Sequence, residues 1–260
     1  MKLSNLLMLP VAVVAAVVIS SCSNEKPYAI NGVLNVPSEI PYGDTIISIP
    51  SPEGTWVYLV EGEEPIDSCQ VVDNRFAFTG TIKADDAHFA QVACMYFMSL
   101  VAIEPGDINL YSDGSETHVT GTPSNDGVNG MFFALGEVEN YIQHKMQLIE
   151  DSLTQVGEEA DYQHFMALQD EYNTLQAAKL DSIYEANQDN LASVYAAVLR
   201  HAGDGSSAEF EAAMNEYPER VKNNEFVRSC INAMKEQEAA YGGFQLDDSM
   251  LIDSEEESAE

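Results

Sequence analysis

The residues best suited to chemistry are four cysteines and five histidines, and their spacing gives no complete active site. Asp161 and His164 stand three residues apart, a spacing used in di-metal helical bundles, but such sites need two Glu-x-x-His units and further carboxylates. Asp107 and Asn109 begin an EF-hand pattern that Tyr111 breaks, so Asp107 is expected to be a turn residue. We therefore predict no metal site and no cofactor, and expect His164 to be a surface histidine.

Motifs of catalysis are missing as well. No two cysteines form a C-x-x-C pair, so the sequence carries no thioredoxin-like redox centre of its own. It also lacks the G-x-S-x-G, H-E-x-x-H and G-x-x-x-x-G-K patterns. Triads are recognised by geometry rather than by sequence order, so this absence favours a non-catalytic protein without excluding an enzyme.

The first 21 residues are predicted to be a secretory signal. Lys2 is basic, and the apolar run from Leu6 to Ile19 is too short to span a bilayer comfortably. The tetrad Ile19-Ser20-Ser21-Cys22 resembles the lipobox of bacterial lipoproteins. That resemblance implies that Cys22 receives a diacylglycerol and that its freed amine is acylated, for example with palmitate. Two or more chains give lasting anchorage. The alternative is an ordinary cleaved signal followed by a chance cysteine.

The charge balance is strongly acidic. The 260 residues include 43 acidic and 11 basic side chains, for a net charge of −32, and removal of the signal would make it −33. Such a surface repels nucleic acid and anionic membrane surfaces, so nucleic acid is not an expected partner. It suits solubility, weak binding of divalent ions or a basic partner. A hydrophobic content of 45% is enough for a sizeable core.

The three remaining cysteines are Cys69, Cys94 and Cys230. An exported chain meets oxidising conditions in which disulfides persist, and an odd number leaves at least one thiol unpaired. Cys69 and Cys94 both lie in expected strands and are the candidate disulfide pair. The alternative is that both are ordinary buried thiols, and Cys230 is expected in a helix core.

The chain divides into a β region and a helical region. After a short tether over residues 22–27, apolar residues alternate with polar ones in many short segments over residues 28–122, which predicts an antiparallel β-sandwich or a small barrel. Asp73-Asn74 suits a hairpin turn. Over residues 123–243 the apolar spacing becomes three and four, which predicts an all-helical domain with a long antiparallel hairpin. Residues 244–260 are expected to be a disordered acidic tail.

A set of landmarks in the β region resembles the domain-of-unknown-function family 4369 (DUF4369). In order they are Tyr28-x-Ile30-x-Gly32, Val57-Tyr58-Leu59, Ile66-Asp67-Ser68 with Val71, Phe76-x-Phe78-x-Gly80, Glu104-Pro105-Gly106, Gly121-Thr122 and Asn125-Asp126. The resemblance covers residues 28–241 and is strongest before Asn125. It implies an envelope lipoprotein, in which helices and then a thioredoxin-like domain often follow the β domain. Here an acidic segment follows instead, so the redox chemistry of those relatives is not carried over.

Two functions are expected from these observations. The first is a lipid-anchored, non-catalytic binding or docking module of the cell envelope, most simply at the outer membrane, with an envelope protein or glycan as partner. The second is an accessory to thiol–disulfide exchange, for which Cys69, Cys94 and Cys230 would be the reactive groups. The sequence names no ligand and leaves open which side of the outer membrane the protein faces.

Overall fold

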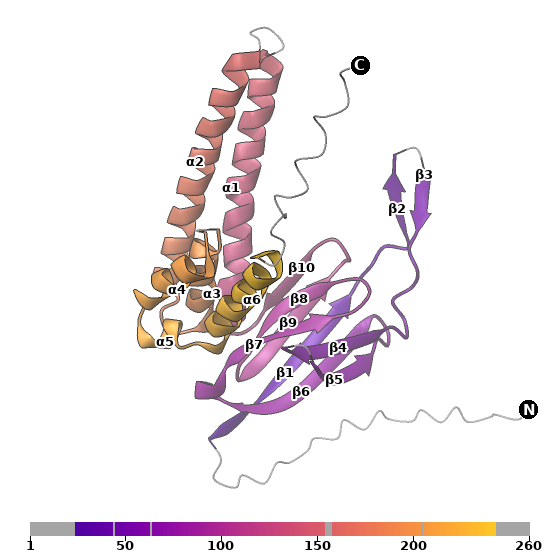
Figure 1. The fold of residues 1–260 in the computed structure, drawn as a ribbon. Helices are drawn as coiled ribbons and strands as arrows, with labels where there is room; N and C mark the ends of the chain where they lie inside the picture. The colour runs from indigo at the N-terminus through magenta and orange to yellow at the C-terminus, as the bar shows by residue number, and fades with distance from the viewer. Residues whose placement is uncertain (1–23, 44, 63, 154–157, 204, 243–260) are drawn as a thin grey trace, which may run out of the picture.

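The computed structural model describes residues 24–43, 45–62, 64–153, 158–203 and 205–242 (Figure 1). Over these residues the chain is an α+β protein in which strands come first and helices follow, as the sequence predicts. The expected signal peptide (1–21), Cys22 and the expected acidic tail (244–260) lie outside the described residues. No helix within the described part is long and apolar enough to cross a membrane.

The strands form two four-stranded sheets and one separate pair. Their bounds are β1 (Glu25–Leu34), β2 (Glu39–Tyr42), β3 (Thr45–Ser48), β4 (Trp56–Glu61), β5 (Glu64–Gln70), β6 (Arg75–Lys83), β7 (His88–Ala93), β8 (Met98–Ile103), β9 (Gly106–Ser112) and β10 (Thr117–Thr120), with a short 3-10 turn, η1 (Ala84–Asp86). One sheet has the order β10-β9-β1-β6, and we call it the polar sheet for its outer surface. The other has the order β5-β4-β7-β8, and we call it the helix-backed sheet.

Two details of the predicted β architecture are wrong. β1 pairs with β9 in parallel, so the polar sheet is mixed rather than purely antiparallel. The long excursion between β1 and β9 permits this, because a parallel neighbour needs a crossover that a tight hairpin cannot supply. The small barrel is also excluded for the described strands, because they form separate open sheets.

A single apolar core joins the two four-stranded sheets. Alternation places every second residue of each strand inward. Ile30, Phe78 and Ile108 of the polar sheet and Val57 and Val92 of the helix-backed sheet belong to the same buried cluster. β4 lies inside the helix-backed sheet, between β5 and β7.

The strand pair β1–β6 is held in register by two aromatic–glycine contacts. Tyr28 lies opposite Gly80, and Gly32 lies opposite Phe76. A Cβ atom on Gly32 would stand 2.1 Å from the Phe76 ring, and one on Gly80 would stand 2.6 Å from the Tyr28 ring. Each ring therefore covers the glycine of the other strand, which explains two of the sequence landmarks as packing devices.

The turn at Asp73-Asn74 is present, but it does not join two strands of one sheet. Both residues have positive φ, 53° and 58°, and Val72 and Arg75 exchange backbone hydrogen bonds across the turn. This geometry matches the tight hairpin turn that the sequence predicts. The flanking strands then separate, because β5 enters the helix-backed sheet and β6 enters the polar sheet.

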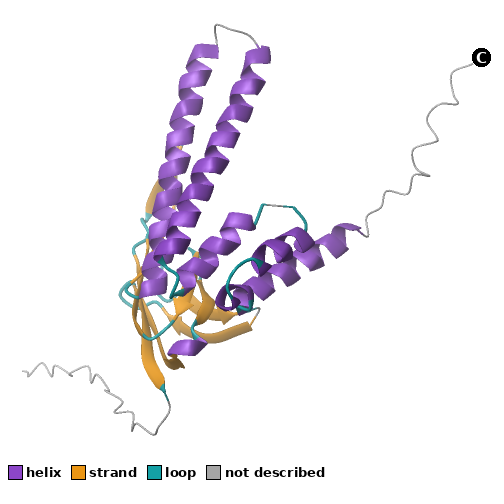
Figure 2. Ribbon diagram, turned by 90° about the vertical axis from the view of Figure 1, so that its left-hand side faces the viewer, coloured by secondary structure: helices purple, strands orange, loops and turns teal. Residues whose placement is uncertain are grey.

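The helical region begins at once after the sheets. The helices are α1 (Pro123–Leu153), α2 (Glu158–Ala186), α3 (Leu191–His201), α4 (Ser207–Asn215), α5 (Glu219–Lys222) and α6 (Glu225–Gly242). α1 and α2 lie side by side and extend away from the sheets, while α3 to α6 gather near their base (Figures 1 and 2). Gly127 lies inside α1, where a Cβ atom would come within 2.6 Å of Ala192 of α3.

Buried polar contacts connect the helix-backed sheet to the helices. Asn125, at the start of α1, accepts from the Ala102 N–H and donates to the Ala102 carbonyl, both at 2.9 Å, as a neighbouring strand would. Glu104 accepts from the Ser124 N–H and hydroxyl at 2.8 and 2.7 Å. The Ser124 oxygen accepts in turn from the N–H of Leu191, the first residue of α3. These side chains fix where α1 and α3 begin.

Candidate functional site

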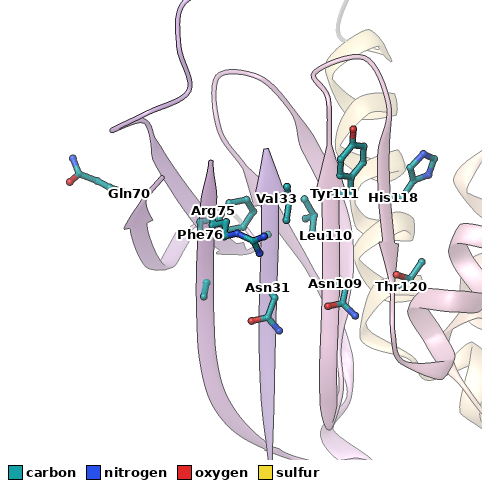
Figure 3. Close-up of a pocket in the computed structure, with 12 residues that line it drawn as sticks. Asn31, Val33, Gln70, Arg75, Phe76, Asn109, Leu110, Tyr111, His118 and Thr120 are labelled. Carbon is teal, nitrogen blue, oxygen red and sulfur yellow. The ribbon is translucent and has the colours of Figure 1, made fainter. Parts of the chain in front are cut away.

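A concavity lies on the outer surface of the polar sheet, a surface that we call the polar face (Figure 3). It encloses a hollow of about 550 Å³. Most of its wall comes from the four strands of that sheet, and Gln70 comes from β5. The residues that line it are Asn31, Gly32, Val33, Gln70, Arg75, Phe76, Ala77, Asn109, Leu110, Tyr111, His118 and Thr120.

Strand alternation and register set the outward side chains in two cross-strand rows. With Ile30, Phe78 and Ile108 turned into the core, their chain neighbours point outward. The pairings along β6, β1, β9 and β10 give one row of Arg75, Val33, Tyr111 and His118. The same pairings give a second row of Ala77, Asn31, Asn109 and Thr120.

Aromatic rings bound one side of the hollow. The Tyr111 and His118 rings are nearly parallel, with an interplanar angle of 10° and centroids 6.5 Å apart. Phe133 of α1 continues the series, with its ring centroid 5.3 Å from that of His118 at an angle of 9°. Tyr111 is 40% exposed. The order of the strands turns its remaining flank toward Val33 and Arg75, so the ring forms a wall rather than a floor.

The polar side chains of the hollow have unused hydrogen-bonding capacity. Asn31, Asn109 and Arg75 make no side-chain hydrogen bond or ion pair with any residue that the structure describes. Each primary amide offers two N–H donors and a carbonyl acceptor, and the guanidinium offers five donors. A ligand can therefore bond to these groups without displacing an internal partner.

The lining is free of acid in a very acidic protein. The whole chain has 43 Asp and Glu residues, yet none is among the residues that line the hollow. Arg75 supplies a positive charge, and the His118 Nε2 atom lies 3.5 Å from the exposed Glu116 carboxylate outside the lining. The hollow is thus an electrostatically distinct part of the surface, in which an anionic or neutral ligand is not repelled by a facing carboxylate.

The arrangement suits binding rather than bond-making. The lining holds no serine, cysteine, aspartate or glutamate, and among the described residues no hydrogen bond joins its Thr120 hydroxyl to the His118 ring as an activated nucleophile would require. Groups of three or more His, Cys, Asp or Glu side chains placed to hold a metal ion are not found among the described residues. What the face offers is a flat ring, several amide and guanidinium donors, and a small apolar floor at Val33.

The predicted cysteine sites lie elsewhere. Cys69, Cys94 and Cys230 are free, half-buried thiols. Cys69 pairs with Val57 of β4, and the β4–β7 register places Cys94 on the opposite side of the same residue. Their Cα atoms are thus about 9.6 Å apart, two strand spacings, while a disulfide needs less than about 7 Å. A bridge would require the backbone to move, and the pairing stays a prediction.

Burial disfavours the reactive form of two of these thiols. It raises the pKa of the Cys69 thiol, with the Asp67 charge adding to the rise against a lowering backbone hydrogen bond at Ala77. Burial alone raises the pKa of Cys230, a residue of α6 that packs against the core shared with α3. Because the thiolate is the nucleophile, neither environment is that of an activated cysteine.

The other sequence candidates separate in the structure. Asn109 lies in the hollow, but as an outward residue of β9 rather than as an ion ligand. Asp107 lies within β9, so its prediction as a turn residue is wrong. His164 is an exposed residue of α2, far along the chain from the hollow.

Sequence analysis missed Arg75, Val33 and Tyr111 as parts of one site. A usable signal was present, because the outward positions of these strands carry amides, an aromatic ring and arginine where acids are common elsewhere. What the sequence lacked was the parallel pairing of β1 with β9, which sets residues 31 and 109 side by side.

These features define the class: an α+β protein of open sheets followed by helices, with a polar hollow on the outer surface of one sheet. Residues 45–127 match the family described as Domain of unknown function (DUF4369). The predicted resemblance to this family is confirmed over that segment. No curated protein and no solved structure matches the chain significantly.

The landmarks inside the matched segment are explained by packing and connection. Gly121 has φ of +101°, and its N–H donates to Asp126 at 2.8 Å. A Cβ atom there would stand 2.3 Å from the Asp107 carbonyl oxygen. Together with Glu104 and Asn125, these residues join the end of the sheets to α1. These landmarks therefore mark the scaffold that joins the sheets to the helices.

Proposed function

We propose that this protein is a non-catalytic binding module of the cell envelope, held by lipid at Cys22, that takes its ligand on the polar face. The supporting observation is the hollow itself, in which the ring of Tyr111 stands beside amide and guanidinium groups that have no side-chain partner in the part of the chain that the structure describes. Sites that recognise small polar ligands combine such convergent polar groups with an apolar or aromatic wall.

The proposed anchor and the proposed binding face are compatible in space. β1 begins at Glu25, three residues after Cys22. Asn31 and Val33 follow on the same strand, about 20–26 Å further along at 3.3 Å per residue. A lipid at Cys22 would hold the start of β1 near the bilayer and leave the hollow above it, within reach of ligands attached to the envelope.

We further propose that the two four-stranded sheets form a β-sandwich and that α1 and α2 form an antiparallel hairpin. The shared core supports the sandwich. For the helices, Glu137 of α1 pairs with Lys179 of α2, whereas Lys145, two turns later, pairs with Glu171. The residue number of the partner on α2 falls as the residue number on α1 rises. This order is expected of two helices that run in opposite directions.

The redox alternative has no specific support beyond the presence of thiols. The half-buried positions of Cys69 and Cys230, and the burial that raises the pKa of each, disfavour rapid exchange with a partner. Replacement of all three thiols by alanine tests it directly. A mixed disulfide trapped in cells from the wild-type chain, and lost in this variant, would favour the redox function over the binding module.

The binding face is tested with two tyrosines of similar exposure on different sheets. Full-length protein is applied to arrays of envelope protein and glycan fractions as wild type, Tyr111→Ala and Tyr58→Ala. Tyr111 is 40% exposed on the polar face, and Tyr58 is 42% exposed on the outer surface of the helix-backed sheet. We expect Tyr111→Ala to lose retention and Tyr58→Ala to keep it. Equal retention by both variants would refute the assignment of the face.

The anchor is tested separately. Cells grown with radiolabelled palmitate should label the wild-type protein and a Cys230→Ala control, and should not label Cys22→Ala. Release of the Cys22→Ala protein into the soluble envelope fraction is expected at the same time. An unlabelled wild-type protein would refute lipid attachment at Cys22. The polar face would still be tested by the array experiment.

A further inference from the structure

We propose that the ligand of the polar face is an acidic saccharide, with one sugar ring held between Tyr111 and Arg75 above Val33; this inference rests on the proposed binding function. It goes beyond that function by naming the chemical class of the ligand and the part played by each side of the hollow. The three residues stand in one cross-strand row, with β1 in the middle.

The spacing of the row makes a slot. Neighbouring strands lie about 4.8 Å apart, so the backbones at Arg75 and Tyr111 are about 9.6 Å apart across β1. Val33, between them, is the shortest outward side chain of the three. A six-membered ring in van der Waals contact with a flat group on each side needs about 7–8 Å between those groups. Because the Arg75 guanidinium reaches toward β1 (Figure 3), the space above Val33 suits a ring whose face lies on Tyr111 and whose edge meets that guanidinium.

The walls of the slot fit a sugar. A pyranose presents C–H groups on its faces and hydroxyl groups around its edge. The Tyr111 ring gives one face an aromatic partner. Asn31 and Asn109, directly opposite each other in the next row, present both donors and acceptors to hydroxyl groups at the edge. A purely aromatic ligand would leave these amides unpaired, which binding sites avoid because unpaired polar groups cost affinity.

Charge favours an acidic sugar over a neutral one. Arg75 makes no ion pair with a described residue, although the chain holds almost four acids for each base. In Figure 3 its guanidinium extends from β6 toward β1, over the row that contains Asn31. The absence of acid from the lining leaves this cation unopposed inside the hollow. A planar guanidinium matches a carboxylate with two parallel hydrogen bonds.

The openness of the site also fits one unit of a longer chain. The hollow follows the strands of an exposed sheet, and Arg75, Asn31 and Asn109 are all exposed. A buried pocket would accept only a free monosaccharide. An open groove lets the glycan continue past both ends of the slot, which suits a polymer of the envelope or of its surroundings.

The experiment uses galacturonate and its neutral methyl ester, which differ only in the charge of the carboxyl group. Each is titrated into the full-length protein, and the side-chain amide signals of Asn31 and Asn109 are followed by NMR. We expect the acid to bind about fivefold more tightly than the ester, as expected for an exposed ion pair worth about 1 kcal/mol. Added NaCl should reduce the affinity for the acid more than for the ester.

Variants separate the roles. Arg75→Gln should bind acid and ester equally, because it removes the charge and keeps a hydrogen-bond donor. Val33→Phe should fill the slot and weaken both sugars at least tenfold, as should Tyr111→Ala. Tyr58→Ala should bind as wild type does. Unchanged thermal unfolding of Val33→Phe would show that its effect is local.

The outcomes distinguish this inference from the proposed function. Equal affinity for acid and ester in the wild type would overturn the acidic specificity. Amide signals that do not move with either sugar would overturn the saccharide as a class, even if the arrays show a ligand whose retention depends on Tyr111. Arrays that show no such ligand would overturn the proposed function as well.

Discussion

The two four-stranded sheets turn similar apolar surfaces into one core, but their outer surfaces differ. On the helix-backed sheet, Phe89 and Ala102 lie beneath α3 and α6, and the Phe89 ring is 4.9 Å from that of Phe226. The rest of that surface includes large exposed apolar side chains, with Trp56 and Met98 at 50% and 70%. On the polar sheet, the helix contact that stands out among the described residues is at the edge strand β10, where His118 meets Phe133.

This difference shows that inward positions are set by folding, whereas outward positions are set by what covers each sheet. Inward positions of both sheets are constrained by a common core, so they share aliphatic and aromatic residues. Outward positions are constrained by what covers them. α3 and α6 need apolar partners on the helix-backed sheet, whereas little of the protein covers the middle of the polar sheet. The polar face is therefore where side chains can be chosen for a ligand rather than for the fold.

The largest expected effect comes from the inward side of the polar sheet. Phe78→Ala should lower the free energy of unfolding by about 3–5 kcal/mol, because it removes a ring that is 2% exposed in the shared core. Val33→Ala, on the outward side of the neighbouring strand, should cost about 1 kcal/mol or less. Denaturant unfolding of both variants measures the contrast. Similar losses would mean that the outer surface is structural too.

A smaller effect is expected at the connection between the helix-backed sheet and α1. Asn125→Ala removes the side chain that pairs with the Ala102 N–H and carbonyl, and should cost about 2–3 kcal/mol because these backbone groups stay buried. Asn31→Ala is the matched control, since its amide is exposed and makes no hydrogen bond with another described residue, and it should stay within about 0.5 kcal/mol. Parallel denaturant titrations compare the two. A mild Asn125 variant would indicate that the helices are held mainly by apolar contacts.

The smallest effect concerns His88, the first residue of β7 in the helix-backed sheet. Burial of its ring lowers the pKa, but the hydrogen bonds to the Asp86 carbonyl and to Glu61, at 2.9 and 2.8 Å, outweigh it and raise the pKa above the usual 6.5. Both acceptors are satisfied only when both ring nitrogens carry protons. The stabilisation is thus complete below about pH 6.5 and is lost as the pH rises through the raised pKa of the folded state.

The size of this effect is about 0.5–1 kcal/mol, because the pair is partly exposed to solvent. It is measured as the difference in unfolding free energy between wild type and His88→Gln at pH 5.5 and at pH 9. The difference should shrink at the higher pH, and Glu61→Gln should reduce it at the lower one. A constant difference across this range would show that the ion pair does not contribute to stability.

The order of strands before helices was predictable because the spacing of apolar residues changes from two to three and four near residue 121. The turn at Asp73-Asn74 was predictable as well, since these residues tolerate positive φ. The sheet to which each strand belongs was not predictable. β5 and β6 leave one tight turn for different sheets, and β1 pairs in parallel with a strand far along the chain. Alternation specifies a face, but it does not specify a neighbour.

The polar face could not be predicted from the sequence, because its residues come from strands whose pairing could not be predicted. Asn31, Asn109 and Arg75 belong to three strands, and each one alone is an ordinary outward residue. Only the register brings them to one place. Cys69 and Cys94 were candidates for a disulfide, but β4 lies between their strands. Their spacing in the sequence does not show this separation, which follows from the strand order.

The aromatic–glycine contacts between β1 and β6 have a consequence for assembly of the sheet. A slip of two residues would keep every side chain on its own surface, so the alternation of apolar and polar residues could not reject it. Such a slip would set Tyr28 against Phe78, or Gly32 against Phe78, and leave an uncovered glycine or a displaced ring. The two glycines on the inner side of the sheet thereby fix the register that sets Asn31, Asn109 and Arg75 beside one another on the outer side. Alanine at Gly32 or Gly80 would therefore weaken ligand binding by shifting this register.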